Sequence, residues 1–108
     1  MNCIKTTFVL SCLLFTSMSF ADADQALTQL QQQWAKAQYE LENKAQDTAF
    51  LALIEQAEEQ TSVYPESAEI WVWKGIISSS YAGVKGGLGA LSLVNGAKDD
   101  FEKSMSID

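Results

Sequence analysis

Residues 65–82 read PESAEIWVWKGIISSSYA, and this stretch predicts a helix that decides how the rest of the domain can pack. Pro65 ends the preceding helix, because the residue before a proline is pushed out of the helical region. Ser67 is a favourable N-cap, and Glu66 and Glu69 suit the positive end of the helix dipole. The helix is expected to run through Trp71, Trp73, Ile76, Ile77 and Tyr81, which are among its apolar residues. They occur on more than one side, so we expect the helix to be buried between neighbours.

Two more helices are predicted before this stretch, because apolar residues recur there at spacings of three and four, the period of one helical face. Asp24 and Asp47 are the expected N-caps. The apolar face of the first helix comprises Leu27, Leu30, Trp34, Ala37 and Leu41. That of the second comprises Phe50, Ile54, Ala57, Thr61 and Tyr64, widened by Leu51 and Leu53. The Gln and Glu residues between them are expected to face solvent.

The glycine-rich segment 83–94, GVKGGLGALSLV, interrupts the helical pattern. We interpret it as a flexible or tightly turned connection. The alternative is that it forms an edge of the repeat that contacts a ligand. A fourth helix is predicted beyond it, with an apolar face of Ala97, Phe101, Ser104 and Met105 and a solvent face of Asp99, Asp100 and Glu102. The expected fold class is therefore all-α: antiparallel helical hairpins, about four helices in all.

The N-terminal residues have the three parts of a secretory signal peptide. Lys5 supplies a positive charge, residues 8–18 (FVLSCLLFTSM) an apolar run, and Ser19 and Ala21 the small residues of a cleavage site. A membrane-spanning anchor needs about 20 apolar residues, so this run is too short. We expect a signal over residues 1–21, with cleavage after Ala23 as an alternative, and an exported protein in a periplasm of the Gram-negative type.

Removal of the signal leaves a domain of residues 22–108 without thiols, since Cys3 and Cys12 both lie in the removed segment. No disulfide is then expected, and lipid attachment at Cys12 is disfavoured because the apolar run continues beyond it. The chain also has no His and no Arg, and its formal net charge is −7. Such a surface repels phosphate backbones and anionic membranes, so we expect no nucleic-acid partner and no stable membrane insertion.

No residue cluster in the sequence specifies catalysis, a metal or a cofactor. The glycines of residues 83–94 lack the following Lys-Ser or Lys-Thr of a phosphate-binding loop. Asp99 and Asp100 are adjacent, so on a helix they point about 100° apart and do not form a carboxylate dyad. Lys74 is expected to extend past Trp71 and Trp73 towards solvent. We therefore expect no enzymatic activity.

The spacing of small and aromatic residues after Pro65 resembles the tetratricopeptide repeat family. Trp71 precedes Gly75 by four residues, and Ala97 precedes Phe101 by four. The physical reason for this pattern is packing, because a small residue on one helix lets an aromatic side chain of the other approach closely. About ten extra residues separate the two motifs compared with the family, and the glycine-rich segment accounts for them.

The resemblance divides the domain into a degenerate half repeat at residues 45–65 and a repeat at 66–108 with its insert at 83–94. Lys74 and Ser78 depart from the family pattern, and a generic bundle of helical hairpins is the alternative. The stretch 79–89 also resembles small exported bacterial members of the family. Further repeats follow in such proteins, so the resemblance implies that the chain is truncated after residue 108.

The function that this resemblance implies is an exported scaffold that binds a protein or peptide and performs no catalysis. The candidate contact residues are Trp71, Trp73, Tyr81, Lys85, Leu88 and Leu91. The alternative is a periplasmic helical bundle that binds a small ligand or a lipid in a pocket lined by residues 83–94.

Overall fold

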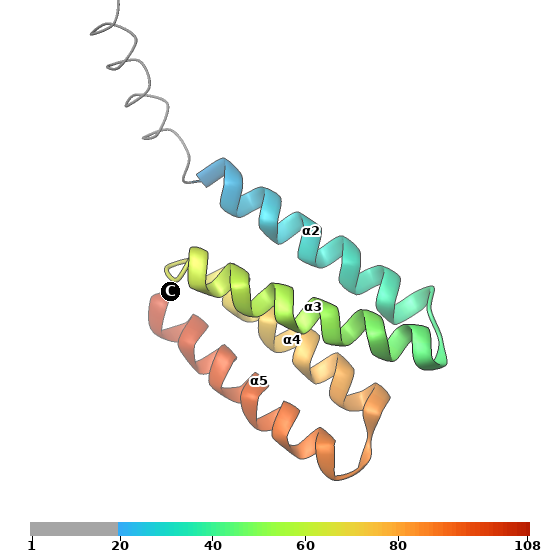
Figure 1. The fold of residues 1–108 in the computed structure, drawn as a ribbon. Coiled ribbons are helices and arrows are strands. Elements are labelled where there is room, and N and C mark those ends of the chain that lie inside the picture. The colour runs from blue at the N-terminus through green and yellow to red at the C-terminus, as the bar shows by residue number, and fades with distance from the viewer. Residues whose placement is uncertain (1–19) are drawn as a thin grey trace, which may run out of the picture.

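The computed structural model describes the backbone of residues 20–108 and the side chains of residues 22–108. These residues form four helices and no strand (Figure 1). The helices are α2 (Phe20–Tyr39), α3 (Asn43–Val63), α4 (Ala68–Lys85) and α5 (Gly87–Ile107). The expected all-α class with about four helices is confirmed. Residues 1–19, which hold most of the predicted signal, lie outside the described residues. None of the four described helices is long and apolar enough to cross a bilayer.

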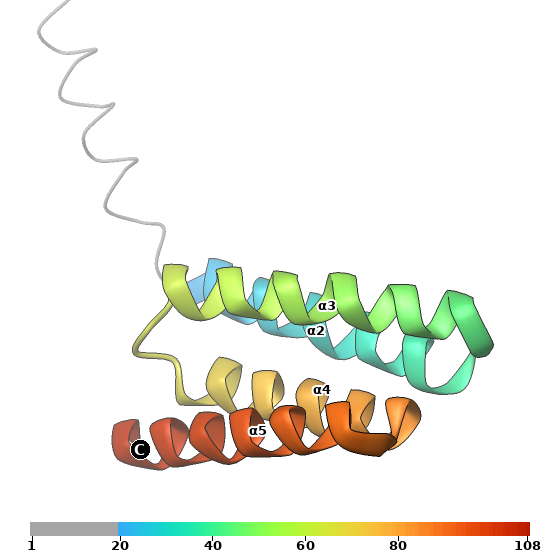
Figure 2. The same ribbon diagram turned by 60° about the horizontal axis from the view of Figure 1, so that its bottom comes forward.

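Consecutive helices run antiparallel and form two hairpins, α2–α3 and α4–α5 (Figures 1 and 2). Helix α4 packs against α2, α3 and α5, whereas α5 packs against α4 alone among the four described helices. The expectation that the stretch around Trp71 is buried between neighbours is thereby confirmed. Because α5 has a single neighbour, much of its surface is left uncovered.

The hydrophobic core lies between α2, α3 and α4. Its largest fully buried side chains are Leu30, Phe50, Ile70 and Ile77. Burying a side chain of this size contributes about 1.5–3 kcal/mol relative to leaving it exposed. Leu53 is buried as expected, but Leu51 is 52% exposed, so the expected widening of the buried face applies to Leu53 alone.

The helix ends confirm one of the three expected N-caps. The backbone N–H of Ile70 donates to Ser67 Oγ at 3.3 Å, as expected for α4. Helix α2 instead begins before Asp24, and α3 begins before Asp47, with Glu42 as its N-cap residue. The Asp47 carboxylate accepts a hydrogen bond from the hydroxyl of Tyr81 in α4, so tertiary packing uses this side chain in place of a cap.

Residues 83–94 contain the tight turn that was one of the expectations, but the interpretation of the whole segment as a connection is wrong. Helix α4 continues to Lys85 and α5 begins at Gly87, so Gly86 alone separates them. Gly86 and Gly87 have φ of 66° and 68°, a region that glycine adopts without the steric cost of a side chain, and this permits the tight turn. The rest of the segment is helical because Leu93 packs against the core, which offsets the low helix propensity of its glycines.

Candidate functional site

Two adjoining hollows lie at the end of the molecule where α4 begins and α5 ends. Their volumes are about 390 Å³ and about 670 Å³, and both are lined by Ala68, Glu69 and Asp108. The first is also lined by Leu27, Gln31, Val72, Trp73, Ser104 and Met105. The second is also lined by Ala23, Asp24, Val63, Tyr64, Pro65, Glu66, Ser67 and Ile107. We call the two together the terminal groove, since they share one wall.

Hydrogen bonds between separate elements hold the walls of the terminal groove in place. Ser104 Oγ in α5 donates to the carbonyl oxygen of Ala68 in α4 at 2.7 Å, which fixes the end of α5 beside the start of α4. Trp71 Nε1 donates to the carbonyl oxygen of Pro65 at 3.0 Å and anchors the turn between α3 and α4. The groove is therefore a defined surface built from α2, the end of α3, α4, α5 and this turn.

The floor of the first hollow is apolar and includes Trp73, one of the candidate contact residues. Trp73 is half-buried and packs edge-on against Trp34 of α2, with ring centroids 5.4 Å apart. Trp34 Nε1 in turn donates to Ser80 Oγ of α4 at 2.8 Å. Because these contacts hold one side of the indole rigidly, its other side can contact a ligand at a low cost in side-chain entropy.

The charged residues that line the terminal groove all carry the same sign. They are Asp24, Glu66, Glu69 and Asp108, and each of them is exposed. Among residues 22–108, no lysine lines either hollow. A hollow lined by one sign of charge concentrates ions of the opposite sign. The groove therefore favours ligands that combine apolar groups with positive charge.

The structure separates the six candidate contact residues. Trp73 lies in the terminal groove, while Lys85, Leu88 and Leu91 lie near the α4–α5 turn at the other end of α4 and α5 (Figures 1 and 2). Trp71 lies outside both hollows, and its indole N–H stabilises the α3–α4 turn by donating to the carbonyl oxygen of Pro65. Sequence reasoning missed the acidic wall of the groove, because its carboxylates come from segments far apart in the chain.

Tyr81 is corrected from a contact residue to a core residue. Its side chain is only 2% exposed, and its ring stacks on Phe50 with centroids 5.7 Å apart. Its hydroxyl donates to Asp47 Oδ1. This hydrogen bond, together with burial, raises the pKa of Tyr81 above its ordinary value of 10.0. A partner cannot reach this side chain while the helices stay packed.

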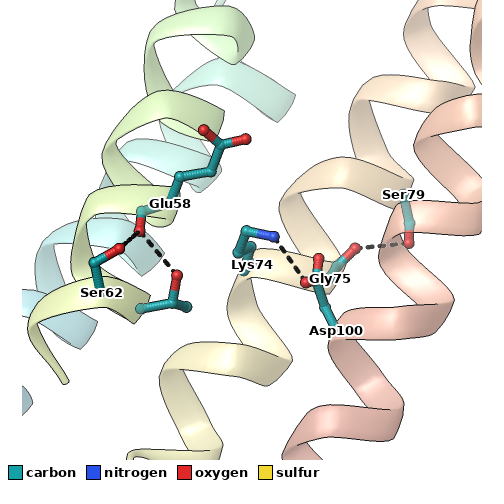
Figure 3. A network of polar contacts seen from close by, with 7 residues as sticks. Glu58, Ser62, Lys74, Gly75, Ser79 and Asp100 are labelled. Atoms are coloured by element: carbon teal, nitrogen blue, oxygen red, sulfur yellow. Dashed lines mark hydrogen bonds and ion pairs between the residues drawn. The ribbon is translucent and has the colours of Figure 1, made fainter. Parts of the chain in front are cut away.

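A half-buried ion pair, which sequence reasoning also missed, joins α4 to α5 (Figure 3). Lys74 Nζ donates to Asp100 Oδ1 at 2.7 Å and lies 5.6 Å from the centroid of the Trp71 ring. Lys74 therefore does not extend past the tryptophans to open solvent, and that prediction is wrong. Asp100 was predicted to face solvent, but it is only 4% exposed. The reason is that α4 and α5 pack closely enough for the two charges to meet.

The pKa of Asp100 is set by its burial and by the charged groups around it. Burial raises the pKa of its carboxyl above the ordinary 3.8, and the hydrogen bond from Lys74 lowers it by less. Its Oδ2 atom is buried without a hydrogen-bond partner among the described residues. Figure 3 shows Glu58 of α3 across from this pair, and its charge raises the pKa of Asp100 slightly further. This arrangement is a structural contact between helices, outside both hollows of the terminal groove.

The second contact between α4 and α5 is the one expected from the spacing of small and aromatic residues. The ring of Phe101 lies over the backbone of Gly75, and a Cβ atom built at Gly75 would be 2.6 Å from Phe101 Cε1. Ala97 is buried one turn before Phe101. The packing reason given for this spacing is therefore confirmed for these helices.

Comparison of the chain with protein-family models, with curated proteins and with solved structures finds no match. The resemblance to tetratricopeptide repeats consequently stays a prediction, and the function is argued from the terminal groove.

Proposed function

We propose that this protein is a scaffold of the tetratricopeptide kind that binds a segment of another protein in its terminal groove. The observation that carries the proposal is the combination, in that groove, of an apolar floor with exclusively acidic charged residues. Two antiparallel helix pairs, with the close approach of Phe101 to Gly75 inside the second pair, support the repeat interpretation. The predicted signal over residues 1–21 supports an exported, periplasmic scaffold.

The ligand class follows from the lining of the groove. Leu27, Val72 and Met105 offer an apolar surface beside Trp73, which suits aliphatic side chains. Glu66 and Glu69 at the rim suit a lysine or arginine of the ligand. Charged groups of this kind add association rate and specificity, while the apolar contacts supply most of the affinity. We therefore propose a peptide segment with leucine-like and basic residues as the ligand.

The alternative, a pocket for a small ligand or a lipid, has less support. Both hollows open widely to the surface, whereas small-molecule sites enclose most of the ligand. The carboxylates at the rim would also repel the anionic head group of a fatty acid.

The proposal is tested by calorimetric titration of the protein with two peptides that differ only in having lysine or glutamate beside shared leucines. We expect the lysine peptide to bind and the glutamate peptide not to bind. The variant Glu69→Lys should weaken binding about tenfold, equivalent to about 1.4 kcal/mol. The matched control is Glu55→Lys, at an exposed position of α3 outside both hollows, which should bind like the wild type. Equal binding of both peptides would refute the proposed ligand class.

A further inference from the structure

The end of the molecule opposite the terminal groove exposes apolar side chains around the α4–α5 turn. We call this surface the hairpin tip; it consists of Val84, Lys85, Leu88, Leu91 and Val94. Leu88 is 93% exposed and Leu91 is 63% exposed. Isolated exposed apolar residues need no explanation, but four of them around one turn mark a contact surface.

The charge of the hairpin tip is opposite to that of the rest of the molecule. From residue 75 to residue 97, Lys85 is the only charged residue, in a chain with 14 Asp and Glu residues. Lys85 is exposed, and its Nζ lies 5.7 Å from the centroid of the Tyr81 ring. The tip thus presents one cation among apolar side chains on a short helical hairpin.

We propose that the hairpin tip of one copy of this chain binds the terminal groove of a second copy, so that copies associate head to tail. This inference rests on the proposed function of the groove, and it names the ligand. The tip combines leucine side chains with a lysine, which are the groups that the apolar floor and the acidic rim of the groove favour. Complementary charges of this kind select the pairing and its orientation.

The same charges disfavour the two symmetric ways in which copies could pair. A contact between two tips would bring two Lys85 side chains together, and a contact between two grooves would bring Glu66 and Glu69 against their own copies. Like charges placed together cost free energy. Only the contact of tip with groove pairs opposite charges.

The position of the two surfaces sets the form of the assembly. The turn between α4 and α5 and the end of α5 at residue 108 lie at opposite ends of the helices (Figures 1 and 2). Contact between different surfaces of two copies leaves one tip and one groove free, so further copies can add. The assembly therefore grows with protein concentration and is weakened by salt.

Sedimentation velocity of the purified protein over a range of concentrations tests the proposal. We expect association for the wild type and monomers for both Leu88→Asp and Glu69→Lys, each at an exposed position where a polar residue is tolerated. An equimolar mixture of the two variants should form a 1:1 dimer and nothing larger, because it contains one intact groove and one intact tip per pair. The control Leu51→Asp, on an exposed apolar residue of α3, should associate like the wild type.

Three results would overturn the inference: a wild type that stays monomeric, a mixture of the two variants that stays monomeric, or Leu88→Asp associating as the wild type does. Flotation of a monomeric wild type, but not of Leu88→Asp, with phosphatidylcholine vesicles would also overturn it by assigning the tip to a membrane. Leu88→Asp keeps an intact groove, so it should still bind the lysine peptide. A wild-type protein that binds that peptide but does not self-associate would refute this inference and leave the proposed function standing.

Discussion

Replacing Gly75 by alanine changes the contact between α4 and α5 by one methyl group. Two effects oppose each other. Alanine is a better helix former than glycine, which should stabilise an interior helical position by about 1 kcal/mol. The new Cβ, however, would lie 2.6 Å from Cε1 and 2.8 Å from Cζ of Phe101. Carbon atoms pack at about 3.5–4.0 Å, so the ring must move by roughly 1 Å.

The steric effect should be the larger of the two. Inserting a methyl group into well-packed surroundings typically costs about 1–3 kcal/mol. Taking about 2 kcal/mol for the ring displacement and subtracting the gain in helix propensity, we expect Gly75→Ala to lower the free energy of unfolding by about 1 kcal/mol. Phe101 is half-buried, so the ring can move, but only by giving up part of its contact with α4.

Urea denaturation followed by far-ultraviolet circular dichroism measures this change, with an unchanged m-value showing that the surface exposed on unfolding stays the same. In a Phe101→Leu background the two closest ring atoms are absent, so Gly75→Ala should become neutral or stabilising. The control Gly96→Ala has no atom within 4 Å of the new Cβ and should stabilise by about 0.5–1 kcal/mol. If Gly75→Ala stabilises the wild type as much as Gly96→Ala does, the steric reasoning is wrong.

Three further changes test other parts of the structure. Ser67→Ala removes the side-chain acceptor for the Ile70 N–H and should destabilise by about 1 kcal/mol in urea denaturation, whereas exposed Ser92→Ala should not destabilise. Gly86→Ala places a side chain at φ 66° and should cost about 1–3 kcal/mol by the same assay; a cost below that of Ser67→Ala would contradict the requirement for glycine at this turn. The folded-state pKa of Asp100 is raised, so its contribution to stability is fully present below the ordinary 3.8 and is lost as pH rises through the folded pKa. The unfolding free energy of the wild type relative to Asp100→Asn should therefore increase as the pH is lowered from 7 to 3. A decrease would show that Lys74 lowers the pKa of Asp100 by more than burial raises it.

The helices were predictable where local sequence decides them. Ser67 after Pro65 predicted the start of α4 correctly, because a cap and a proline act through the backbone of a few neighbouring residues. The glycine-rich segment 83–94 was misread for the opposite reason. Glycine is a weak helix former, but the packing of Leu93 against the core outweighs that preference, and no local signal reports such packing.

The acidic wall of the candidate site could not be predicted from local pattern. Asp24, Glu66 and Asp108 are far apart in the sequence and meet only because the start of α2, the α3–α4 turn and the end of α5 lie at the same side of the molecule. Asp100 was misplaced for a related reason, since its ion-pair partner Lys74 lies on another helix. Charged residues on helices are usually solvated, so the exception shows only when two helices are packed.

The sequence by itself determined the all-α class, most of the buried faces of α2 and α3, and the close approach of an aromatic side chain to a small residue between α4 and α5, because these depend on spacing along the chain. Only the tertiary structure decided which ends of the helices meet. That choice placed Trp73 beside acidic side chains at one end and Leu88 with Lys85 at the other, while it buried Tyr81 in the core. Function depends on this placement, since a binding surface is made by side chains that are close in space and need not be close in the chain.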